Sequence, residues 1–168
     1  MTNTIKKYLE KFTNWKDYGR LGTAFEMAIK EYLSGKEQKT VRSQGKKDAY
    51  FTYYENGKRK QVTIEIKTAC GEIETADKSQ YICYCPYVDI DIPAEEQAYM
   101  FSREDWQAFI NGYTGRGKFT KLDSRGHLHI QSFYCESRPK ASKPIADYIY
   151  TTCNQQLTLA DWKEERRG

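Results

Sequence analysis

The chain has 168 residues and a formal net charge of +4, and its 14 Tyr, 7 Phe and 3 Trp exclude a disordered composition. Such a length fits one domain with a real core, and the mild basicity permits a polyanionic partner without requiring one. Residues 1–12 lack the apolar core of a signal peptide, and no run of about 18 apolar residues could span a membrane. With five Cys, an odd number, the composition indicates a cytoplasmic protein with reduced thiols.

Apolar residues recur at helical spacing through residues 5–33. Gly19 and Gly22 predict a break between a short first helix and a second one, and Gly35 is suited to end the second helix. Farther on, Asn56-Gly57 lies between two runs of alternating residues, which is the strongest short-range signal for a β-hairpin. The sequence therefore begins with two helices followed by a hairpin.

The remainder of the chain alternates between predicted strands and helices. Strands are expected over residues 80–88, 98–101, 118–122 and 127–134. Ser102 is placed to cap one helix, and Pro144 opens another that runs to about Cys153. The tail from Leu157 is expected to add no more than a turn of helix and to fray at its end.

This order of elements is typical of the α/β or α+β class, with a central mixed β-sheet flanked by helices. We expect a single domain over residues 1–168, since no internal repeat or long linker divides the chain. The core motifs fall within about residues 20–110, and the strands and helix of residues 115–168 are expected to pack on that core.

The hairpin turn determines which residues of its two strands face each other. If Asn56-Gly57 is a two-residue turn, Ala49 faces Ile64 and Phe51 faces Val62, so these apolar side chains share one face. A shift by one residue would break this agreement, which supports the register.

The same register gathers charged residues on the other face. Asp48 lies opposite Glu65, and Lys67, two residues farther on, points the same way. Two opposed carboxylates repel each other unless a cation lies between them. Carboxylates are the protein ligands of Mg²⁺, and a bound ion favours attack of water on a phosphodiester.

These residues resemble the PD-(D/E)xK phosphodiesterase superfamily, which includes restriction endonucleases, Holliday-junction resolvases and many phage nucleases. Its usual pattern is a Glu on the first core helix, an Asp at a strand start and a Glu/Asp-x-Lys on the next strand. Here the pattern reads Glu26 in GTAFEMAIKEYL, Asp48 in SQGKKDAYF and Glu65-Ile66-Lys67 in VTIEIKTACG. The match covers residues 20–67, and Lys47 stands where many members have Pro. The resemblance implies a restriction endonuclease-like core.

The resemblance also implies roles for the matching residues. Asp48 and Glu65 would ligate Mg²⁺ or Mn²⁺, and Lys67 would orient the attacking water and stabilise charge on the phosphate. Glu26 would complete the site through a metal-bound water. Taken alone, Glu26 could equally form a solvent-facing i,i+4 pair with Lys30.

Basic residues cluster in loops that could grip phosphates. They occur in residues 114–118, just before the Asp of the motif, and in residues 137–143, and the candidates for DNA contacts are Lys46, Lys47, Arg138, Lys140 and Lys143. Any one of these loops could be ordinary solvated charge. Together with a candidate metal site, they favour DNA over a small phosphate as the partner.

Two further patterns have simpler explanations than a metal site. Cys83 and Cys85 share a strand face, and some nucleases of this superfamily carry an iron–sulfur cluster, but the absence of a Cys-x-x-Cys pair favours buried free thiols. His127 and His129 also share a face, yet two His without a Cys or carboxylate partner at ligand spacing are a weak indication of zinc.

The sequence thus predicts a Mg²⁺- or Mn²⁺-dependent DNA endonuclease of the phage or mobile-element type. One alternative is a catalytically inactive DNA-binding or assembly module that retains the nuclease fold. Another is a small partner-binding protein with a decorated hairpin. The choice among duplex, flap, junction and RNA substrates stays open at this stage, as does the formation of a homodimer.

Overall fold

The computed structural model describes residues 4–11, 18–38, 49–68, 72–74, 79–86, 88–111, 120–122, 127–130 and 143–167. Its helices are α1 (Thr4–Glu10), α2 (Tyr18–Ser34), α3 (Ala94–Gln97), α4 (Arg103–Asn111), α5 (Lys143–Cys153) and α6 (Leu159–Glu165). Its strands are β1 (Ala49–Glu55), β2 (Lys58–Thr68), β3 (Glu72–Glu74), β4 (Tyr81–Cys85), β5 (Tyr99–Ser102), β6 (Thr120–Leu122) and β7 (His127–Ile130). Within these ranges, no helix is both long and apolar enough to cross a bilayer.

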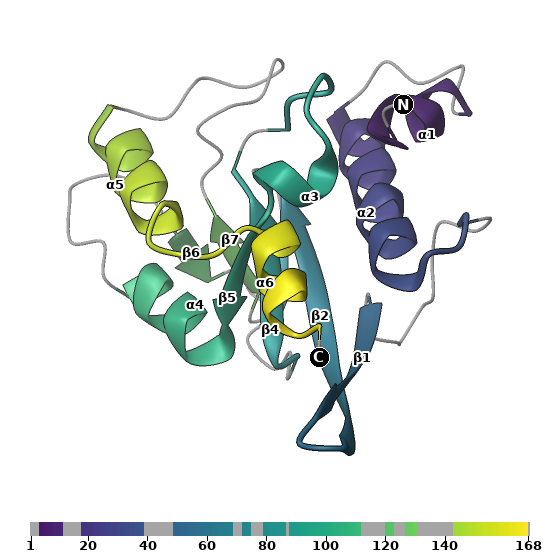
Figure 1. Ribbon diagram of the computed structural model, residues 1–168. Coiled ribbons are helices and arrows are strands. Elements are labelled where there is room, and N and C mark those ends of the chain that lie inside the picture. Colours follow the sequence, from purple (N-terminus) through teal and green to yellow (C-terminus); the bar gives the residue numbers. More distant parts are fainter. Residues whose placement is uncertain are drawn as a thin grey trace.

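The strands form two sheets (Figure 1). The larger sheet has the order β1-β2-β4-β5 and is mixed, because β2 runs parallel to β4 while the other neighbours are antiparallel. The smaller sheet has the order β3-β7-β6 and is antiparallel. The expected mixed sheet with flanking helices is confirmed as an α+β arrangement, and the later strands join β3 in a sheet of their own.

The hairpin of β1 and β2 has the predicted register. Asn56 and Gly57 have φ values of 52° and 76°, the left-handed pair that a two-residue type I′ turn requires. Ala49 pairs with Ile64 and Phe51 with Val62, as the apolar pattern predicted. In Figure 1 the hairpin extends beyond the rest of the sheet, so its two strands reach away from the helices.

One face of the larger sheet carries the main hydrophobic core. Side chains of β2 and β4 on this face, including Ile64, Ile66 and Cys83, are buried against apolar residues of α1, α2, α3 and α6, such as Phe25 and Leu159. Figure 1 shows α6 over β2 and β4, with α2 on the β1 side of the sheet. Burial of these side chains, each contributing about 1.5–3 kcal/mol relative to exposure, holds the helices to the sheet.

The opposite face carries an aromatic cluster. Tyr84 of β4 and Phe101 of β5 are fully buried there, with the Trp106 ring of α4 at centroid distances of 5.1 Å and 5.3 Å from them. Phe109 of α4 stacks on Tyr148 of α5 at 5.6 Å, so the cluster joins both helices to β4 and β5. In Figure 1 these two helices lie on the β5 side of the sheet.

The predicted short first helix and the second helix are confirmed as α1 and α2, but the break was wrongly placed at Gly19 and Gly22, because both residues lie inside α2. A Cβ atom at Gly22 would stand 3.5 Å from the Thr68 side-chain oxygen, an ordinary contact distance, so this position of α2 lies beside the end of β2. The predicted C-terminal stop is confirmed, since Gly35 has a φ of 73° and its N–H donates to the Glu31 carbonyl at 2.7 Å.

Two predicted strands are described over shorter ranges than expected, and residues 131–134 lie outside the described residues. The strand expected over residues 80–88 is shortened to β4, which ends just before Pro86, a residue that has no N–H to donate to a neighbouring strand. The strand expected over residues 127–134 is described only as β7. Ser102 caps α4 as predicted, its hydroxyl accepting from the Asp105 N–H at 3.0 Å.

The expected fraying of the tail was also wrong. Helix α6 begins after Thr158, whose hydroxyl accepts from the Asp161 N–H at 3.2 Å, and the Leu159 N–H donates to the Ala98 carbonyl at 2.8 Å. Near its C-terminal end, the Lys163 ammonium donates to the Tyr32 carbonyl of α2 at 2.9 Å. These contacts with distant elements keep the C-terminal helix in place.

Substitution of Gly57 by Val should weaken the fold, since a β-branched residue is strained at a φ of 76°. We expect the free energy of unfolding, measured by urea denaturation, to fall by about 1–2 kcal/mol. Lys58→Val changes the next exposed residue, which needs no left-handed conformation, and serves as the control. Equal stability of the Gly57 variant and the wild type would contradict the role given to the turn.

Candidate active site

The candidate site lies on β2, the strand between β1 and β4. Alternation along β2 directs Val62, Ile64 and Ile66 into the main core, and directs Glu65 and Lys67 to the opposite face. The Lys67 ammonium lies 3.0 Å from a Glu65 carboxylate oxygen. Only 14% of the Glu65 side chain and 19% of the Lys67 side chain is exposed, so the pair is largely screened from solvent.

The surroundings of this pair differ on its two sides. On β4, Ile82 lies beside Glu65 and Tyr84 beside Lys67, and both are buried in the layer under α4. On β1, the described strand begins at Ala49, which pairs with Ile64. The residue predicted to oppose Glu65 is Asp48, which lies outside the described residues, as do Lys46 and Lys47.

The apolar residues of β4 beside the site strengthen the attraction between Glu65 and Lys67. Opposite charges attract more strongly where low-dielectric protein replaces water, so the Glu65–Lys67 attraction exceeds that of an exposed pair. Desolvation of both charges offsets much of this gain. The pair therefore holds two charged groups in fixed positions at modest benefit to stability.

Glu26 occupies a different position from the other motif residues. It lies on α2, which packs against the Ile64 and Ile66 face of β2, whereas Glu65 and Lys67 point to the other face. Its carboxylate pairs with Lys30 at 3.7 Å, the i,i+4 contact considered from sequence. Glu26 follows Gly22 by four residues and so shares the side of α2 that approaches Thr68 at the end of β2.

The remaining candidates are placed only in part. Arg138 and Lys140 lie outside the described residues, and Lys143 is the first residue of α5, with its side chain not described. His127 and His129 lie on β7 directly opposite Glu74 and Glu72 of β3, so each has a carboxylate residue at the facing register position. Among the described side chains, no three His, Cys, Asp or Glu residues come together as a metal-binding group.

The described cysteines are free and buried. Cys83 and Cys85 share the core face of β4, as predicted, and Cys153 ends α5. Burial raises the pKa of the Cys83 thiol, and it raises that of Cys153 to about 12. These thiols therefore act as small apolar groups in the core, which agrees with the interpretation made from sequence.

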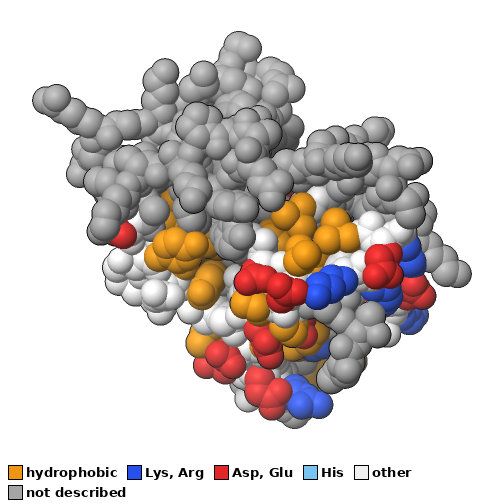
Figure 2. All heavy atoms as spheres, turned by 90° about the horizontal axis from the view of Figure 1, so that it is seen from above, with side chains coloured by type: hydrophobic (Ala, Val, Ile, Leu, Met, Phe, Trp, Pro, Cys, Tyr) orange, Lys and Arg blue, Asp and Glu red, His pale blue; other side chains and the backbone are white. Residues whose placement is uncertain are grey.

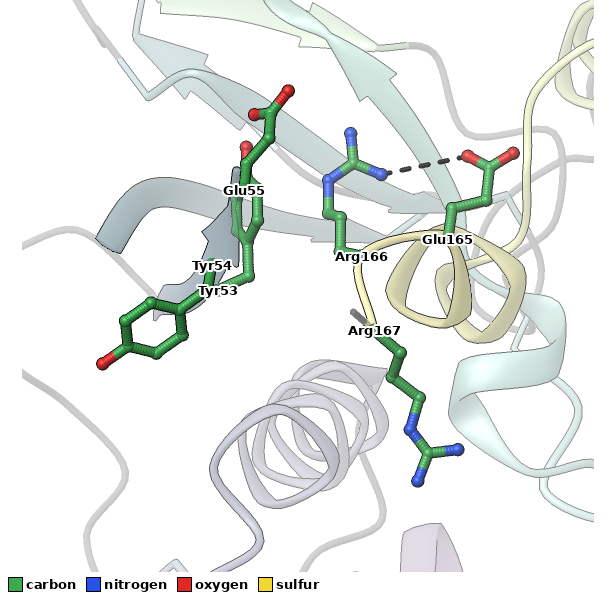
Figure 3. Close-up of a pocket in the computed structure, with 6 residues that line it drawn as sticks. All are labelled: Tyr53, Tyr54, Glu55, Glu165, Arg166 and Arg167. Atoms are coloured by element: carbon green, nitrogen blue, oxygen red, sulfur yellow. Dashed lines mark ion pairs between the residues drawn. The ribbon is translucent and has the colours of Figure 1, made fainter. Parts of the chain in front are cut away.

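A hollow of about 500 Å³ lies between the hairpin and the end of α6, away from the Glu65–Lys67 pair (Figure 3). Its lining residues are Tyr53, Tyr54, Glu55, Glu165, Arg166 and Arg167. The two glutamates offset the two arginines, so the hollow has no strong preference for an anion. Figure 3 shows the Arg166 side chain between β1 and the end of α6, whereas the Arg167 side chain points in the opposite direction.

Arg166 is the residue that sequence analysis missed. Its guanidinium lies 4.0 Å from the Trp162 ring centre, with the rings of Tyr53 and Tyr81 at 5.6 Å and 5.8 Å. It also donates to the Trp162 carbonyl at 3.0 Å and the Tyr81 hydroxyl at 3.4 Å. The spacing of Trp162 and Arg166, four residues apart, is the one local signal for this contact. Arg166 thus fastens α6 to β1 and β4 through its aromatic neighbours.

The described surface seen from above carries acidic and basic side chains intermixed with apolar ones (Figure 2). Helix α1, which lies at this end of the molecule in Figure 1, contributes ion pairs from Lys6 to Asp91 and from Lys7 to Glu31, both at 2.6 Å. Paired charges of this kind give the described part of this surface little net attraction for a polyanion.

Comparison with known proteins adds no relative to this description. No protein-family model, curated protein or solved structure matches the chain. The resemblance to the nuclease superfamily therefore depends on the motif residues and their register alone.

Removal of the Arg166 side chain should loosen the end of α6. Because the guanidinium packs on Trp162, we expect Arg166→Ala to reduce the free energy of unfolding by about 1–2 kcal/mol in urea denaturation, with only partial recovery in Arg166→Lys. Arg167→Ala is the matched control, since that side chain is 77% exposed. A comparable loss in both alanine variants would contradict the anchoring role of Arg166.

The buried thiols should resist alkylation in the native protein. Both thiols are fully buried, and burial raises their pKa, so iodoacetamide should label Cys153 and Cys83 only after unfolding. Peptide mass mapping before and after addition of guanidinium measures this. Rapid native labelling at pH 8 would show that these cysteines are accessible.

Proposed function

We propose that this chain is a Mg²⁺- or Mn²⁺-dependent DNA endonuclease with a restriction endonuclease-like core. The observation that carries the proposal is the Glu65–Lys67 pair, largely buried on a central strand with 3.0 Å between its charged atoms. Such a pair gives little stability, because desolvation of two charges costs about as much as their attraction gains. A chemical role explains its position better than a structural one.

The donor atoms suit a hard divalent cation. Mg²⁺ and Mn²⁺ prefer carboxylate oxygens, and Mg²⁺ commonly uses one or two carboxylates together with water and substrate phosphates. Glu65 supplies one carboxylate, and Asp48 is proposed as the second because the hairpin register, if it continued by one pair, would set Asp48 opposite Glu65. Glu26 is proposed as a supporting carboxylate that acts through water, a role in which it would have to reach the pair around the end of β2, because α2 packs on the other face of this strand. A bound cation would make water a stronger nucleophile and polarise the phosphate.

Lys67 would position water and stabilise charge. Its ammonium has three donors, so it can contact Glu65 and still donate to a water molecule and a phosphate oxygen. The buried side chains of Ile82 and Tyr84 exclude water from the β4 side of the pair. Charge that develops on the phosphate would therefore be stabilised more strongly than in open solvent.

DNA is the proposed substrate because basic residues occur just before Asp48 and again in a later segment of the chain. Lys46 and Lys47 precede Asp48, and Arg138, Lys140 and Lys143 belong to a later basic segment. Their proposed contacts are with phosphates, which supply affinity without reading sequence.

A catalytically inactive DNA-binding module is the second candidate. Lys67 already neutralises Glu65, and Lys30 lies 3.7 Å from the Glu26 carboxylate. A protein that retained the fold and lost the chemistry could keep both ion pairs. Activity measurements separate the two candidates.

Lys67→Ala should abolish cleavage while leaving DNA binding largely intact. Loss of a group that stabilises transition-state charge typically lowers the rate by about 100- to 1000-fold. The measurement compares nicking of linear, flapped and four-way DNA by wild type and variant with Mg²⁺, Mn²⁺ or EDTA. Glu65→Ala should also be inactive, and calorimetry should show that it has lost Mn²⁺ binding.

Lys60→Ala supplies the matched control for this experiment. Lys60 lies on the same strand in an exposed ion pair with Glu55 at 2.8 Å, on the other side of the hairpin. Its removal should leave cleavage unchanged. Cleavage that persists in Lys67→Ala would point to another site or a contaminant. A wild type that binds the DNA panel but cuts none of it would favour the inactive module.

A further inference from the structure

The face of the hairpin that bears the Glu65–Lys67 pair continues outward as an open surface. Pairing assigns to this face three residues of β1 and three of β2, which we call the ribbon face: Tyr50, Thr52, Tyr54, Arg59, Gln61 and Thr63. The opposite face of the hairpin packs on α6, where the rings of Phe51 and Trp162 are 5.4 Å apart. The ribbon face is therefore the side of the hairpin turned away from the core.

Two aromatic rings dominate the ribbon face. Tyr50 is 49% exposed and Tyr54 is 60% exposed, so both rings are open to a ligand. Tyr50 and Tyr54 are four residues apart on one strand, which separates them by about 13 Å along β1. Thr52 and Gln61 lie between them and are joined by a hydrogen bond of 3.4 Å, so the surface between the rings is polar.

The ribbon face leads directly to the candidate site. Tyr50 pairs with Thr63, and Glu65 is the next residue of β2 on the same face, which sets it diagonally across from Tyr50 at about 7–8 Å between backbones. Thr63 also exchanges hydrogen bonds with Gln80 at 3.0 Å and 3.1 Å, which ties this position to the start of β4. From Tyr50 inward, the open face gives way to the largely screened Glu65–Lys67 pair.

The charge of the ribbon face suits a polyanion. Arg59 pairs with Tyr54 at the outer end and is exposed, and at the inner end Glu65 and Lys67 neutralise each other, so the three charges leave a net charge of +1. Two exposed rings beside an exposed cation match the way that proteins hold unpaired bases, by stacking on aromatic side chains beside positive charge. A duplex offers its base faces only at its ends, so the exposed tyrosine rings could stack on few of its bases.

We infer that the ribbon face binds an unpaired DNA strand, whose bases stack on Tyr50 and Tyr54, and directs that strand to the Glu65–Lys67 pair. The inference rests on the proposed function for the direction of the strand and the choice of DNA. It narrows the substrate to DNA with a single-stranded segment, such as a flap or a gap. Tyr50 and Tyr54 are positioning residues that set affinity for the strand.

The test measures binding apart from cleavage. Full-length protein is titrated into labelled oligo(dT) of about 15 nucleotides, a length that covers a typical single-strand site, and into a duplex of equal length, all in EDTA. Tyr50→Leu and Tyr54→Leu should each weaken oligo(dT) binding by about 5- to 100-fold, since the aliphatic side chain cannot stack. Tyr50→Phe and Tyr54→Phe should retain binding. Tyr150→Leu, at a ring on α5 that is 41% exposed, is the control.

Salt dependence distinguishes stacking from electrostatic contact. Between about 50 and 200 mM salt, the Tyr variants should keep the wild-type slope of binding against salt, whereas Arg59→Ala should flatten it. Thermal melting of every variant excludes misfolding as the cause of any loss. Binding of oligo(dT) that is unaffected by both Leu variants, or duplex binding as tight as single-strand binding, would overturn the inference.

The outcomes also separate this inference from the proposed function. If the Leu variants lose oligo(dT) binding but the wild type cuts no DNA with any metal, the results support strand binding by the ribbon face and contradict the nuclease proposal. If the wild type cuts DNA and the Leu variants bind and cut as well as it does, the results support the nuclease proposal and contradict strand binding by the ribbon face. A wild type that binds no oligo(dT) overturns the inference as well.

Discussion

A shift of one residue in the pairing of β1 and β2 would exchange the two faces of the hairpin. Ile64 and Ile66 would then face the aromatic layer under α4, and Glu65 and Lys67 would enter the core beneath α2. The turn at Asn56-Gly57 prevents this, because both residues adopt the positive φ that a two-residue turn needs and that Asn and Gly tolerate best. The core packing, the candidate site and the ribbon face all depend on that one register.

The charged Glu65–Lys67 pair is unusual for a strand that lies between two other strands. A strand with neighbours on both sides, whose side chains are largely screened from solvent, usually carries a continuous run of apolar residues. Yet β2 carries Glu65 and Lys67 where its parallel neighbour β4 carries Ile82 and Tyr84. Each local choice in a natural sequence normally agrees with the fold, and departures concentrate at functional positions. This local departure is the physical basis for treating the pair as a site.

Local interactions made parts of the fold predictable from sequence. The hairpin register followed from the turn and the apolar alternation, and Ser102 followed from its short-range contact with Asp105. Features determined by distant contacts were missed. Gly22 lies inside α2 where this helix packs beside Thr68 of β2, and Arg166 is held by rings from β1 and β4.

The same distinction between local and distant contacts applies to the residues of the candidate site. The Glu65–Lys67 geometry could be predicted because both residues belong to one strand, where alternation fixes the face. The position of Glu26 could not, because it depends on how α2 packs on the sheet and on competition from Lys30 one turn away. The exposed rings of the ribbon face were not distinguishable from core aromatics, since alternation assigns a face but not what covers it.

The exposure of the side chains decreases along the ribbon face toward the Glu65–Lys67 pair. Tyr54 is 60% exposed and Tyr50 is 49% exposed, while Glu65 falls to 14% and the next residue across, Ile82, to 1%. A charged or aromatic ligand that moves inward along β1 therefore passes from water to an environment where each electrostatic contact is stronger. Because Lys67 neutralises Glu65 in the absence of a ligand, the inner end does not repel a phosphate as an isolated carboxylate would. The same ion pair that stabilises the fold only slightly thus removes a repulsion that a phosphate would otherwise meet at the inner end of the ribbon face.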